Sequence, residues 1–498
     1  MGAVAVAGRT LRSGDTAEAA WPAGCTQLVT TLKEDAPEAE RVIRAPHWRD
    51  PGKWSPSELS HRLSGLLRAV GERGTLGRAF SARLRRNARN PFSEATGITD
   101  AERASGLLRV VRIGLEDPAA AAQLAGLLRR SGIASSVHPV VAKTAGVIEP
   151  DIVDQMPSQR PGGWAFQAIH AEEALDLEPG SPRVVVAVVD TGVEVTHPEF
   201  AGKLADGYDF VHMTEGDPTL TGDVRDRDPL PIDDAGHGTH VAGVVGARGL
   251  KMVPGIAGGS RMLPVRVLGT MLEYGTRVGI GQIVDIDDGI KFAVDEGADV
   301  INLSLGINAE GPGIPHQRAV RYALLNNAVV VAAAGNDGTD RPVFPGAVPG
   351  VITVGAITEF SRVASFSSWG PFLDVVAPGT AIYSADLAGR YRYRSGTSHA
   401  APFVAGVAAL IVARARRQGI TMREHAVRQI IRETSARSDR RRQDLWSGAG
   451  LLDARDAIML TSLLIRNHLR RGGRPRLDDP VSNRQPASPA DDRREWPQ

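Results

Sequence analysis

Four polar side chains stand beside glycines or at the ends of apolar runs, and together they have the chemistry of nucleophilic catalysis. They are Asp190 at the end of VVVAVVD, His237 in GHGTH, Asn336 in AAAGND and Ser398 in RSGTSHAAP. In such chemistry a serine hydroxyl attacks a carbonyl, a histidine takes its proton, a carboxylate orients the imidazole, and amide donors stabilise the oxyanion. The set therefore predicts a hydrolase with a serine nucleophile.

Each of these residues also has a structural explanation. Asp190 could cap a helix or form a turn, Ser398 could cap the helix that it precedes, and Asn336 could occupy a left-handed turn. His237 could be an ordinary loop histidine, or it could bind a metal together with His240, although no third His or Cys follows at a ligand-like spacing. The catalytic interpretation depends on all four residues meeting at one site.

The histidine directly after the serine is not expected to be its base. Ser398 and His399 open a long apolar helix, where the helix dipole and free N–H groups favour developing negative charge. Adjacent residues at the start of a helix point about 100° apart. The base is therefore predicted to be His237, whose neighbours Gly236 and Gly238 leave the imidazole accessible.

Composition excludes several classes of protein. The chain has 498 residues, 42% of them apolar, 55 glycines, one cysteine and a net charge of +1. The charge balance favours neither nucleic acid nor a membrane as partner, no apolar run reaches the roughly 18 residues of a membrane span, and no internal disulfide can form. The N-terminus is a poor signal peptide. These features favour a cytoplasmic location over secretion.

Alternating strands and helices predict the fold class from Trp164 onwards. Short β-branched runs that are apolar on both faces are typical of parallel strands covered by helices on both sides. These runs are RVVVAVVD, RMLPVRVL, ADVINLSLG, NAVVVAAAG, GVITVGA and LDVVAPG. We therefore expect a doubly wound α/β domain with a mostly parallel sheet and with its site at the carboxyl ends of the strands.

The rest of the chain divides by composition. A β-α-β pattern over 106–144 predicts a small α+β module, with Asp117-Pro118 opening its helix, and a separate amphipathic helix is expected at 57–74. The expected domains are a partly disordered leader of unknown role (1–100), the module (101–150), a linker (151–163), the α/β domain (164–458) and a polar, disordered tail (459–498).

Several long blocks give the chain a resemblance to the subtilisin-like serine proteases over roughly Trp164 to Ala457. The blocks are AVVDTGVEVTHPEF, HGTHVAGVVG, VINLSLG, AAAGNDG, FSSWG, VVAPG, GTSHAAPFVAG and GAGLLDARDAI, and they occur in the family's order. The resemblance implies a serine endopeptidase with the subtilisin-like fold. It makes Asp190 the orienting acid, His237 the general base, Ser398 the nucleophile and Asn336 an oxyanion donor beside the Ser398 N–H.

The resemblance also assigns residues that contact the substrate. Two backbone segments would line the primary specificity pocket, and an edge strand would pair with extended substrate by β-augmentation. The pocket segments are Ser304, Leu305, Gly306 and Ala333, Ala334, Gly335, and the edge strand is Gly279, Ile280, Gly281. The implied substrates are proteins or peptides.

The chain departs from the family's pattern in two places. His399 stands where the family often has methionine. The family's strong calcium site would use Glu199, but the loop 248–258 lacks the expected asparagines. A structural calcium is therefore in doubt, and no cofactor is expected for the chemistry. An acidic stretch before His237 (Asp223, Asp226, Asp228, Asp233 and Asp234) is interpreted as a solvated loop, with a cation or a basic substrate as the alternative.

The module resembles the family's propeptides, which help the protease to fold and then inhibit it. The chain is therefore expected to be a zymogen whose own N-terminal segment acts as intramolecular inhibitor and chaperone. A fused structural or recruitment domain is the alternative. For the whole chain, the alternatives to a general endopeptidase are a dedicated intracellular maturation protease for one substrate and an inactive scaffold that binds peptides.

Overall fold

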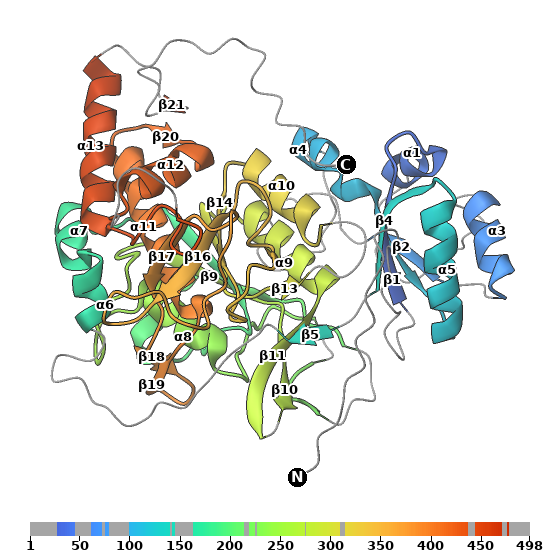
Figure 1. The fold of residues 1–498 in the computed structure, drawn as a ribbon, viewed down its shortest axis with the longest axis horizontal. Helices are drawn as coiled ribbons and strands as arrows, with labels where there is room; N and C mark the ends of the chain where they lie inside the picture. Colours follow the sequence, from blue (N-terminus) through green and yellow to red (C-terminus); the bar gives the residue numbers. More distant parts are fainter. Residues whose placement is uncertain are drawn as a thin grey trace.

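The protein is described by a computed structural model, which has two parts joined by contacts along one side (Figure 1). The described residues are 27–44, 61–71, 75–78, 99–139, 142–144, 163–213, 219–224, 227–273, 275–308, 314–436, 444–470 and 476–477. The predicted leader up to residue 26, the linker from 151 to 162 and the tail beyond 477 lie outside the described residues.

A seven-stranded sheet forms the centre of the larger part. Its order is β17-β16-β14-β12-β6-β9-β7, and every neighbouring pair is parallel. The strands are β6 (Val185–Asp190), β7 (Tyr208–Asp209), β9 (Arg261–Arg266), β12 (Val300–Leu303), β14 (Val329–Ala333), β16 (Ile352–Ile357) and β17 (Val375–Pro378). The six predicted runs are all strands of this sheet. Only the two-residue β7 was missed, because it is too short to give a pattern.

Helices cover both faces of the sheet, as predicted. Alternate residues of β6 enter different apolar clusters: Val186 and Val188 pack on one side with α8 (His237–Gly246) and α11 (Thr397–Arg417). Ala187 and Val189 pack on the other side with α9 (Ile283–Asp295) and α10 (Gln317–Leu325). The doubly wound α/β class is therefore confirmed, and the apolarity of both faces of each strand follows from it.

The core of the larger part is built around α11. By length and composition this helix could cross a membrane, but 94% of its most apolar window is buried inside the protein. It contacts α8, α13 and the five sheet strands β6, β12, β14, β16 and β17. Burial on all sides is what makes a core helix apolar around its whole circumference.

A second, antiparallel sheet of order β2-β3-β1-β4 forms the N-terminal module, and α5 packs on it. Its elements are β1 (Gln27–Leu32), α1 (Pro37–Arg44), α3 (His61–Ala69), β2 (Thr75–Arg78), β3 (Val110–Gly114), α5 (Pro118–Arg130) and β4 (Ala134–Pro139). As expected, Asp117 caps α5 by accepting the N–H groups of Ala119 and Ala120.

The predicted domain boundary at residue 101 is at odds with this sheet. β1 lies between β3 and β4, so a strand from the presumed leader is central to the module. Leu28 and Leu32 are fully buried against α5 residues such as Leu124. The sequence pattern failed here because β1 pairs with strands about 80 to 110 positions later.

A helix also continues past the predicted boundary at residue 458. α13 (Ala454–Arg470) continues twelve residues past it, with Thr461 and Ile465 buried on the side that faces α11 and α7 (Ala171–Leu177). These two positions continue the helical spacing of Ala457 and Ile458, so an apolar stripe persists inside a segment of polar composition.

Shorter elements complete the described part of the chain. They are α4 (Asp100–Ser105), η1 (Leu107–Arg109), β5 (Ala142–Thr144), α6 (Gly163–Ala168), η2 (Pro198–Phe200), β8 (Leu220–Thr221), β10 (Gly269–Glu273), β11 (Thr276–Gln282), β13 (Ile307–Asn308), β15 (Val343–Phe344), β18 (Ile382–Asp386), β19 (Arg390–Arg394), β20 (Thr421–Met422), α12 (Glu424–Thr434) and β21 (Arg476–Leu477).

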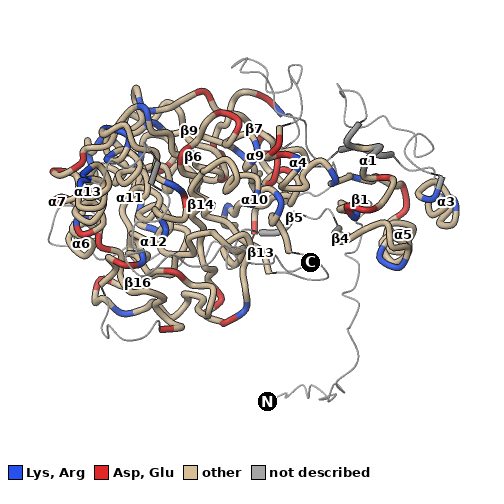
Figure 2. Tube along the Cα trace, turned by 90° about the horizontal axis from the view of Figure 1, so that it is seen from above, with Lys and Arg blue, Asp and Glu red and all other residues tan. Residues whose placement is uncertain are grey.

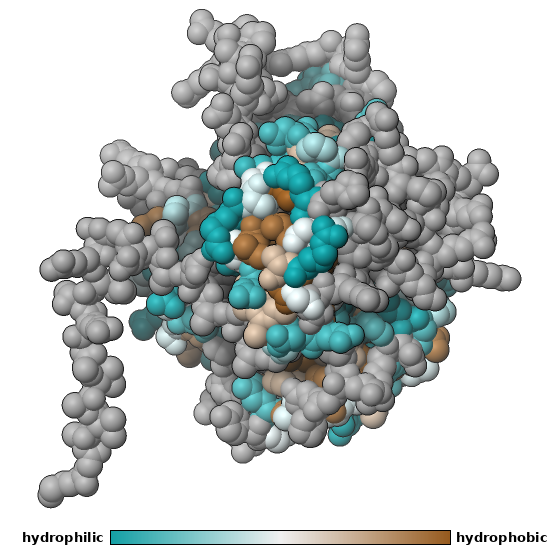
Figure 3. All heavy atoms as spheres, turned by 90° about the vertical axis from the view of Figure 1, so that its right-hand side faces the viewer, coloured by the Kyte–Doolittle hydropathy of each residue, from teal (hydrophilic) through white to brown (hydrophobic). Residues whose placement is uncertain are grey.

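Figures 2 and 3 show where charged residues lie along the chain and where apolar residues lie on one face. Basic and acidic residues are interspersed along both parts of the chain in the view of Figure 2. Figure 3 looks at the molecule from the module's side, where some apolar residues lie together inside a rim of hydrophilic ones.

We expect Ile465→Ala to lower the free energy of unfolding by about 2–4 kcal/mol, because it removes a buried side chain from α13. The matched control is Leu463→Ala in the same helix, where Leu463 is 46% exposed and the change should stay within about 0.5 kcal/mol. Denaturant unfolding measures both. Equal, negligible effects would mean that residues 459–470 are a tail after all.

Candidate active site

The carboxyl ends of β6, β12 and β14 carry three of the predicted site regions. Asp190 is the last residue of β6 and is fully buried. Its Oδ1 accepts the N–H of Thr191 at 2.7 Å and lies 2.6 Å from Nδ1 of His237. A buried carboxylate needs such partners because desolvation would otherwise disfavour its charge.

His237 is the first residue of α8, and two glycines allow it to stand against β6. Gly236 has φ of 88°, in the left-handed region, and ends the preceding turn. A methyl group on Gly238 would lie only 2.1 Å from the backbone oxygen of Gly192, so no larger residue fits. The glycines on either side of His237 therefore let the start of α8 approach the end of β6. The imidazole itself is only 2% exposed, so the accessibility expected from the sequence is not seen.

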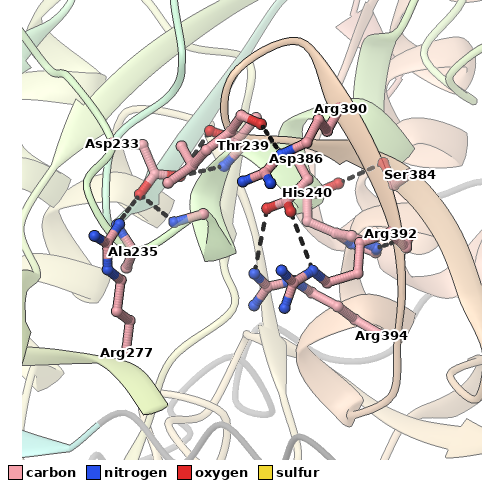
Figure 4. Close-up of polar contacts among 12 residues, drawn as sticks. Asp233, Ala235, Thr239, His240, Arg277, Ser384, Asp386, Arg390, Arg392 and Arg394 are labelled. Carbon is pink, nitrogen blue, oxygen red and sulfur yellow. Dashed lines mark hydrogen bonds and ion pairs between the residues drawn. The ribbon is translucent and has the colours of Figure 1, made fainter. Parts of the chain in front are cut away.

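Asp233 anchors the start of α8, a role that the sequence did not reveal. It is buried, its Oδ1 accepts the N–H groups of Ala235 and Gly236, and its Oδ2 accepts from the backbone and hydroxyl of Thr239 (Figure 4). Thr191 adds a hydroxyl donor to Oδ1 at 2.8 Å. The interpretation of this stretch as a solvated loop is thus wrong for Asp233. An acidic residue just before an apolar helix was the available signal.

Ser398 is the second residue of α11 and is 5% exposed. Its backbone oxygen accepts the hydroxyl of Ser304 at 2.6 Å, and Ser304 in turn accepts from the side-chain amide of Asn302 in β12. The predicted nucleophile is therefore held to the end of a central strand through two buried side chains.

Asn336 lies directly beside the start of α11. Its Oδ1 accepts both the N–H and the hydroxyl of Thr397, each at 2.8 Å, and this fixes the orientation of the side-chain amide. A methyl group on Gly396 would lie 3.4 Å from Nδ2 of Asn336 and 3.7 Å from the backbone nitrogen of Ser398. The two predicted oxyanion donors thus flank one point near the start of the helix.

The structure makes one of the two hydrogen bonds expected between the predicted catalytic side chains. His237 bonds to Asp190 through Nδ1, but its Nε2 has no hydrogen-bond partner among the described residues. Ser398 nonetheless lies in the first turn of the helix that packs beside His237: the ring of the next residue, His399, lies 5.3 Å from the His237 ring. Catalytic hydrogen bonds are often long before substrate binds.

His399 packs between two other histidines. Its ring is fully buried, 5.3 Å from the ring of His237 and 4.5 Å from that of His240 in an edge-on arrangement. Burial, together with His240, His237 and Arg394, lowers the pKa of His399 well below its ordinary value. His399 is therefore an uncharged wall beside His237 at neutral pH.

Asp386 forms ion pairs with two arginines close to His240. Asp386 lies between Arg392 and Arg394, with Oδ2 3.1 Å from Nε of Arg392 and Oδ1 3.5 Å from Nη2 of Arg394 (Figure 4). His240 is held by contacts from Nε2 to the backbone oxygens of Ile382 and Arg392. Burial and the charge of Arg394 lower the pKa of His240 well below its ordinary value. His240 is thus a neutral packing residue.

The predicted edge strand is occupied by another part of the same chain. Gly279, Ile280 and Gly281 lie in β11, within a sheet of order β5-β11-β10-β8. β5 pairs antiparallel with β11, Thr144 lying opposite Ile280 and Lys143 opposite Gly281. This edge of β11 is therefore able to accept an extended segment through its backbone.

The two predicted pocket segments follow β12 and end β14. Ser304, Leu305, Ala333 and Ala334 are buried, whereas Gly306 and Gly335 at the outer ends are partly exposed. Since Gly335 precedes Asn336 and Ser304 bonds to Ser398, both segments border the start of α11. Their place next to the predicted nucleophile agrees with a role in holding substrate.

Comparison with known proteins places this arrangement in a family. The profile of the subtilase family matches residues 181–452, more than half of the chain. The chain belongs to the subtilase family. As a subtilase, it is a member of a family of serine proteases with the α/β fold described above.

Relatives support this assignment. The thermophilic serine proteinase of Bacillus sp. (strain AK1) is 42% identical over 50% of this chain and 57% of its own length. Thermitase of Thermoactinomyces vulgaris is 39% identical over 50% of this chain and 82% of its own length. A solved protease structure from Pseudoalteromonas arctica PAMC 21717 is similar with a TM-score of 0.51 and 30% identity, covering 61% of this chain and all (100%) of that one.

Calcium binding is common among subtilases, but the surroundings of Glu199 do not fit a cation. Its carboxylate already accepts the backbone N–H groups of Gly249, Leu250 and Lys251 at 2.7–3.0 Å, and the hydroxyl of Tyr391 at 3.0 Å. Donors that converge on a carboxylate occupy the positions from which a calcium ion would be bound. Among the described residues, no group of three or more His, Cys, Asp or Glu side chains is arranged so that it could hold a metal ion.

The side-chain ammonium group of Lys203 binds backbone oxygens at both ends of the same loop. Nζ of Lys203 donates to the oxygens of Gly246 and Gly258, at 2.8 and 2.5 Å. These glycines flank the segment held by Glu199. The loop is thus fixed at both ends by the protein's own charges, and Glu199 is not supported as a metal ligand.

We expect Glu199→Gln to lower the free energy of unfolding at pH 7 by about 1–3 kcal/mol, because the charged acceptor of several hydrogen bonds is lost. Burial alone would raise the pKa of Glu199, but the bonds from Leu250, Lys251, Tyr391 and Gly249 lower it from the ordinary 4.5. The stabilisation is therefore complete above pH about 4.5 and is lost as the pH falls through the folded-state value.

Denaturant unfolding at pH 7 and at pH 3–4 measures this effect, and the difference between the two proteins should shrink at the lower pH. If Glu199→Gln lowered the free energy of unfolding equally at both pH values, the stabilising role given to the charged Glu199 carboxylate would be contradicted. So would a wild-type midpoint that rises on addition of calcium and falls with a chelator.

Proposed function

We propose that this subtilase is a serine endopeptidase in which Asp190, His237 and Ser398 form the catalytic triad. The observation that carries the proposal is the 2.6 Å contact between Nδ1 of His237 and Oδ1 of Asp190, near the start of α11, where Ser398 is the second residue. A proton on Nδ1, donated to Asp190, leaves the lone pair on Nε2. This is the tautomer that a general base requires.

The reaction follows from these positions. Oγ of Ser398 attacks the peptide carbonyl while Nε2 of His237 takes its proton, and Asp190 stabilises the imidazolium. Nδ2 of Asn336 and the N–H of Ser398 donate to the oxyanion. His237 then gives the proton to the leaving amine, which departs from the acyl-enzyme. Water repeats the sequence in the second half-reaction and releases Ser398.

The N-terminal module is proposed to be an intramolecular inhibitor that occupies the substrate's strand position. β5 pairs with β11 as an extended substrate would, and its last residue, Thr144, lies opposite Ile280. Because the two strands are antiparallel, β5 runs toward Gly279, the residue before Ile280 in β11. Gly279 lies against Thr191, since a methyl group on Gly279 would be 2.9 Å from Cγ2 of Thr191. The C-terminal end of β5 is therefore directed toward Asp190.

Buried contacts attach the module to the protease domain. Glu102 is fully buried, and its Oε1 lies 3.1 Å from Nζ of Lys291, which is also buried. The pair thus joins the N-terminal part of the chain to α9 of the protease domain. Val29, Leu107 and Val110 of the N-terminal part enter the same apolar cluster as α9 and α10.

Labelling by a fluorophosphonate tests the catalytic assignment, because the reagent is attacked by an activated serine. We expect the wild-type protein to be labelled, Ser398→Ala to be unlabelled and His237→Ala to lose nearly all labelling. The matched control is His399→Met, which should keep most of it because His399 is a wall of the site. The reverse ranking of the two histidine variants would overturn the assignment.

The same samples test the inhibitor role by mass spectrometry. Wild-type protein should acquire a new N-terminus between Thr144 and Trp164 that is absent in Ser398→Ala. An intact chain that is labelled and hydrolyses peptides would contradict the inhibitor role while leaving the catalytic assignment in place.

A further inference from the structure

Two arginine side chains converge where the N-terminal part of the chain rests on the protease domain. Arg109 belongs to η1, and Arg318 belongs to α10, which packs against η1 and α4. A methyl group on Gly106 would lie within 2.8 Å of both Nη2 of Arg109 and Nη1 of Arg318, so the two guanidinium groups meet over one α-carbon. Gly106 has φ of 75°, a left-handed conformation that suits glycine, and its missing side chain leaves room for both groups.

The N–H donors of these two guanidinium groups are only weakly satisfied. Among the described residues Arg318 forms no ion pair, and its hydrogen bonds, to Thr31 and to a backbone oxygen, are both 3.4 Å long. Arg109 donates to a backbone oxygen at 3.3 Å and lies 3.5 Å from Glu34, whose side chain is 88% exposed. Ordinary N–H···O bonds are about 2.7–3.2 Å long, and bonds between charged partners are at the short end of that range.

Positive charges from both parts of the chain act on Arg318. Burial lowers the pKa of Arg318, and the charges of Arg109 and Arg321 lower it further, to about 10, whereas only Glu34 raises it. Burial likewise lowers the pKa of Arg109. Like charges that are partly removed from water repel each other more strongly than they do at the surface. A negative charge placed between the two guanidinium groups would therefore be stabilised.

We propose that this contact is a binding site for a small oxyanion of the phosphate type, which bridges Arg109 of the N-terminal part and Arg318 of the protease domain. A guanidinium group presents its N–H donors as a planar fork that matches two oxygens of a phosphate. The side chain of Arg109 is only 13% exposed, so the place suits a free anion rather than a phosphorylated polymer.

A bound anion would hold the two parts of the chain together. The donors come from both parts, so release of the N-terminal part destroys the anion site, and by linkage an anion that binds the site opposes release. This consequence rests on the proposed function, in which cleavage between Thr144 and Trp164 separates the module from the protease domain. Phosphate is therefore expected to keep the cleaved module in place.

Isothermal titration calorimetry with inorganic phosphate tests the anion site directly. It uses the full-length Ser398→Ala protein at pH 7 and constant ionic strength, with chloride as the competing anion. We expect one saturable site per chain. Adding Arg318→Gln should weaken binding by about 10-fold or more, because a charge-assisted hydrogen bond to the anion is lost. The matched control is Arg68→Gln, which removes an exposed charge from α3 and should leave the affinity unchanged.

Three results would overturn the anion site. The first is the absence of saturable phosphate binding, and the second is an Arg318→Gln protein that binds phosphate as tightly as its parent. The third is an Arg318→Gln protein that unfolds at lower denaturant concentration than its parent without phosphate, because loss of a repelled charge should not destabilise the fold. AMP is the probe for a phosphate carried by a larger molecule, and an affinity equal to that of inorganic phosphate would overturn the assignment to a small free anion.

The effect on the module is measured in protein that retains Ser398. Phosphate at about 10 times its dissociation constant should shift the equilibrium between docked and released module about 10-fold toward docking, as seen by size-exclusion chromatography of the cleaved protein. Arg318→Gln should show no such shift. An equal shift in both proteins, or none in the wild type, would overturn the holding role. Wild-type protein that is neither cleaved nor active would overturn the proposed function, while calorimetry on the Ser398→Ala protein still decides whether the anion site exists.

Discussion

The contact between His237 and Asp190 is the constraint on which the site depends. It joins the first residue of α8 to the last residue of β6, both of them buried. A carboxylate at that depth requires donors, and Asp190 finds them in its own neighbour Thr191 and in His237. Gly238 lies so close to the backbone of Gly192 that α8 can take this position only with a glycine there.

The remaining parts of the site are fixed by comparable contacts at the same edge of the sheet. Asp233 gathers the free N–H groups at the start of α8, and Ser304 holds the backbone of Ser398. Thr397 fixes the orientation of the Asn336 side-chain amide by donating its N–H to Oδ1. Each anchor satisfies a polar group that the fold has buried, so the hydrogen bonds that stabilise the structure also position the groups proposed for catalysis.

The sequence predicted the central sheet well because its strands are apolar on both faces and end in recognisable turns. Asp190, His237, Asn336 and Ser398 were found from their positions at strand and helix ends, and they lie at the same edge of the fold; their catalytic roles stay a proposal. The burial of Asp233, the place of β1 in the module and the continuation of α13 were not predicted. Asp233 and β1 each contact residues that are distant in the chain, and only a few buried residues mark the end of α13. Local composition therefore gave no sign of these features.

The central claim is that Asp190 orients His237 for proton transfer, and the turnover of Asp190→Asn tests it most directly. An asparagine preserves the shape of the side chain but favours the wrong imidazole tautomer, as established for the Asp/His/Ser arrangement. Steady-state hydrolysis of a peptide p-nitroanilide at pH 7, with folding checked by circular dichroism, should show kcat reduced on the order of 10⁴-fold. A correctly folded variant whose kcat falls by less than about 10-fold would contradict the account, because such a loss is too small for a triad that works through this contact.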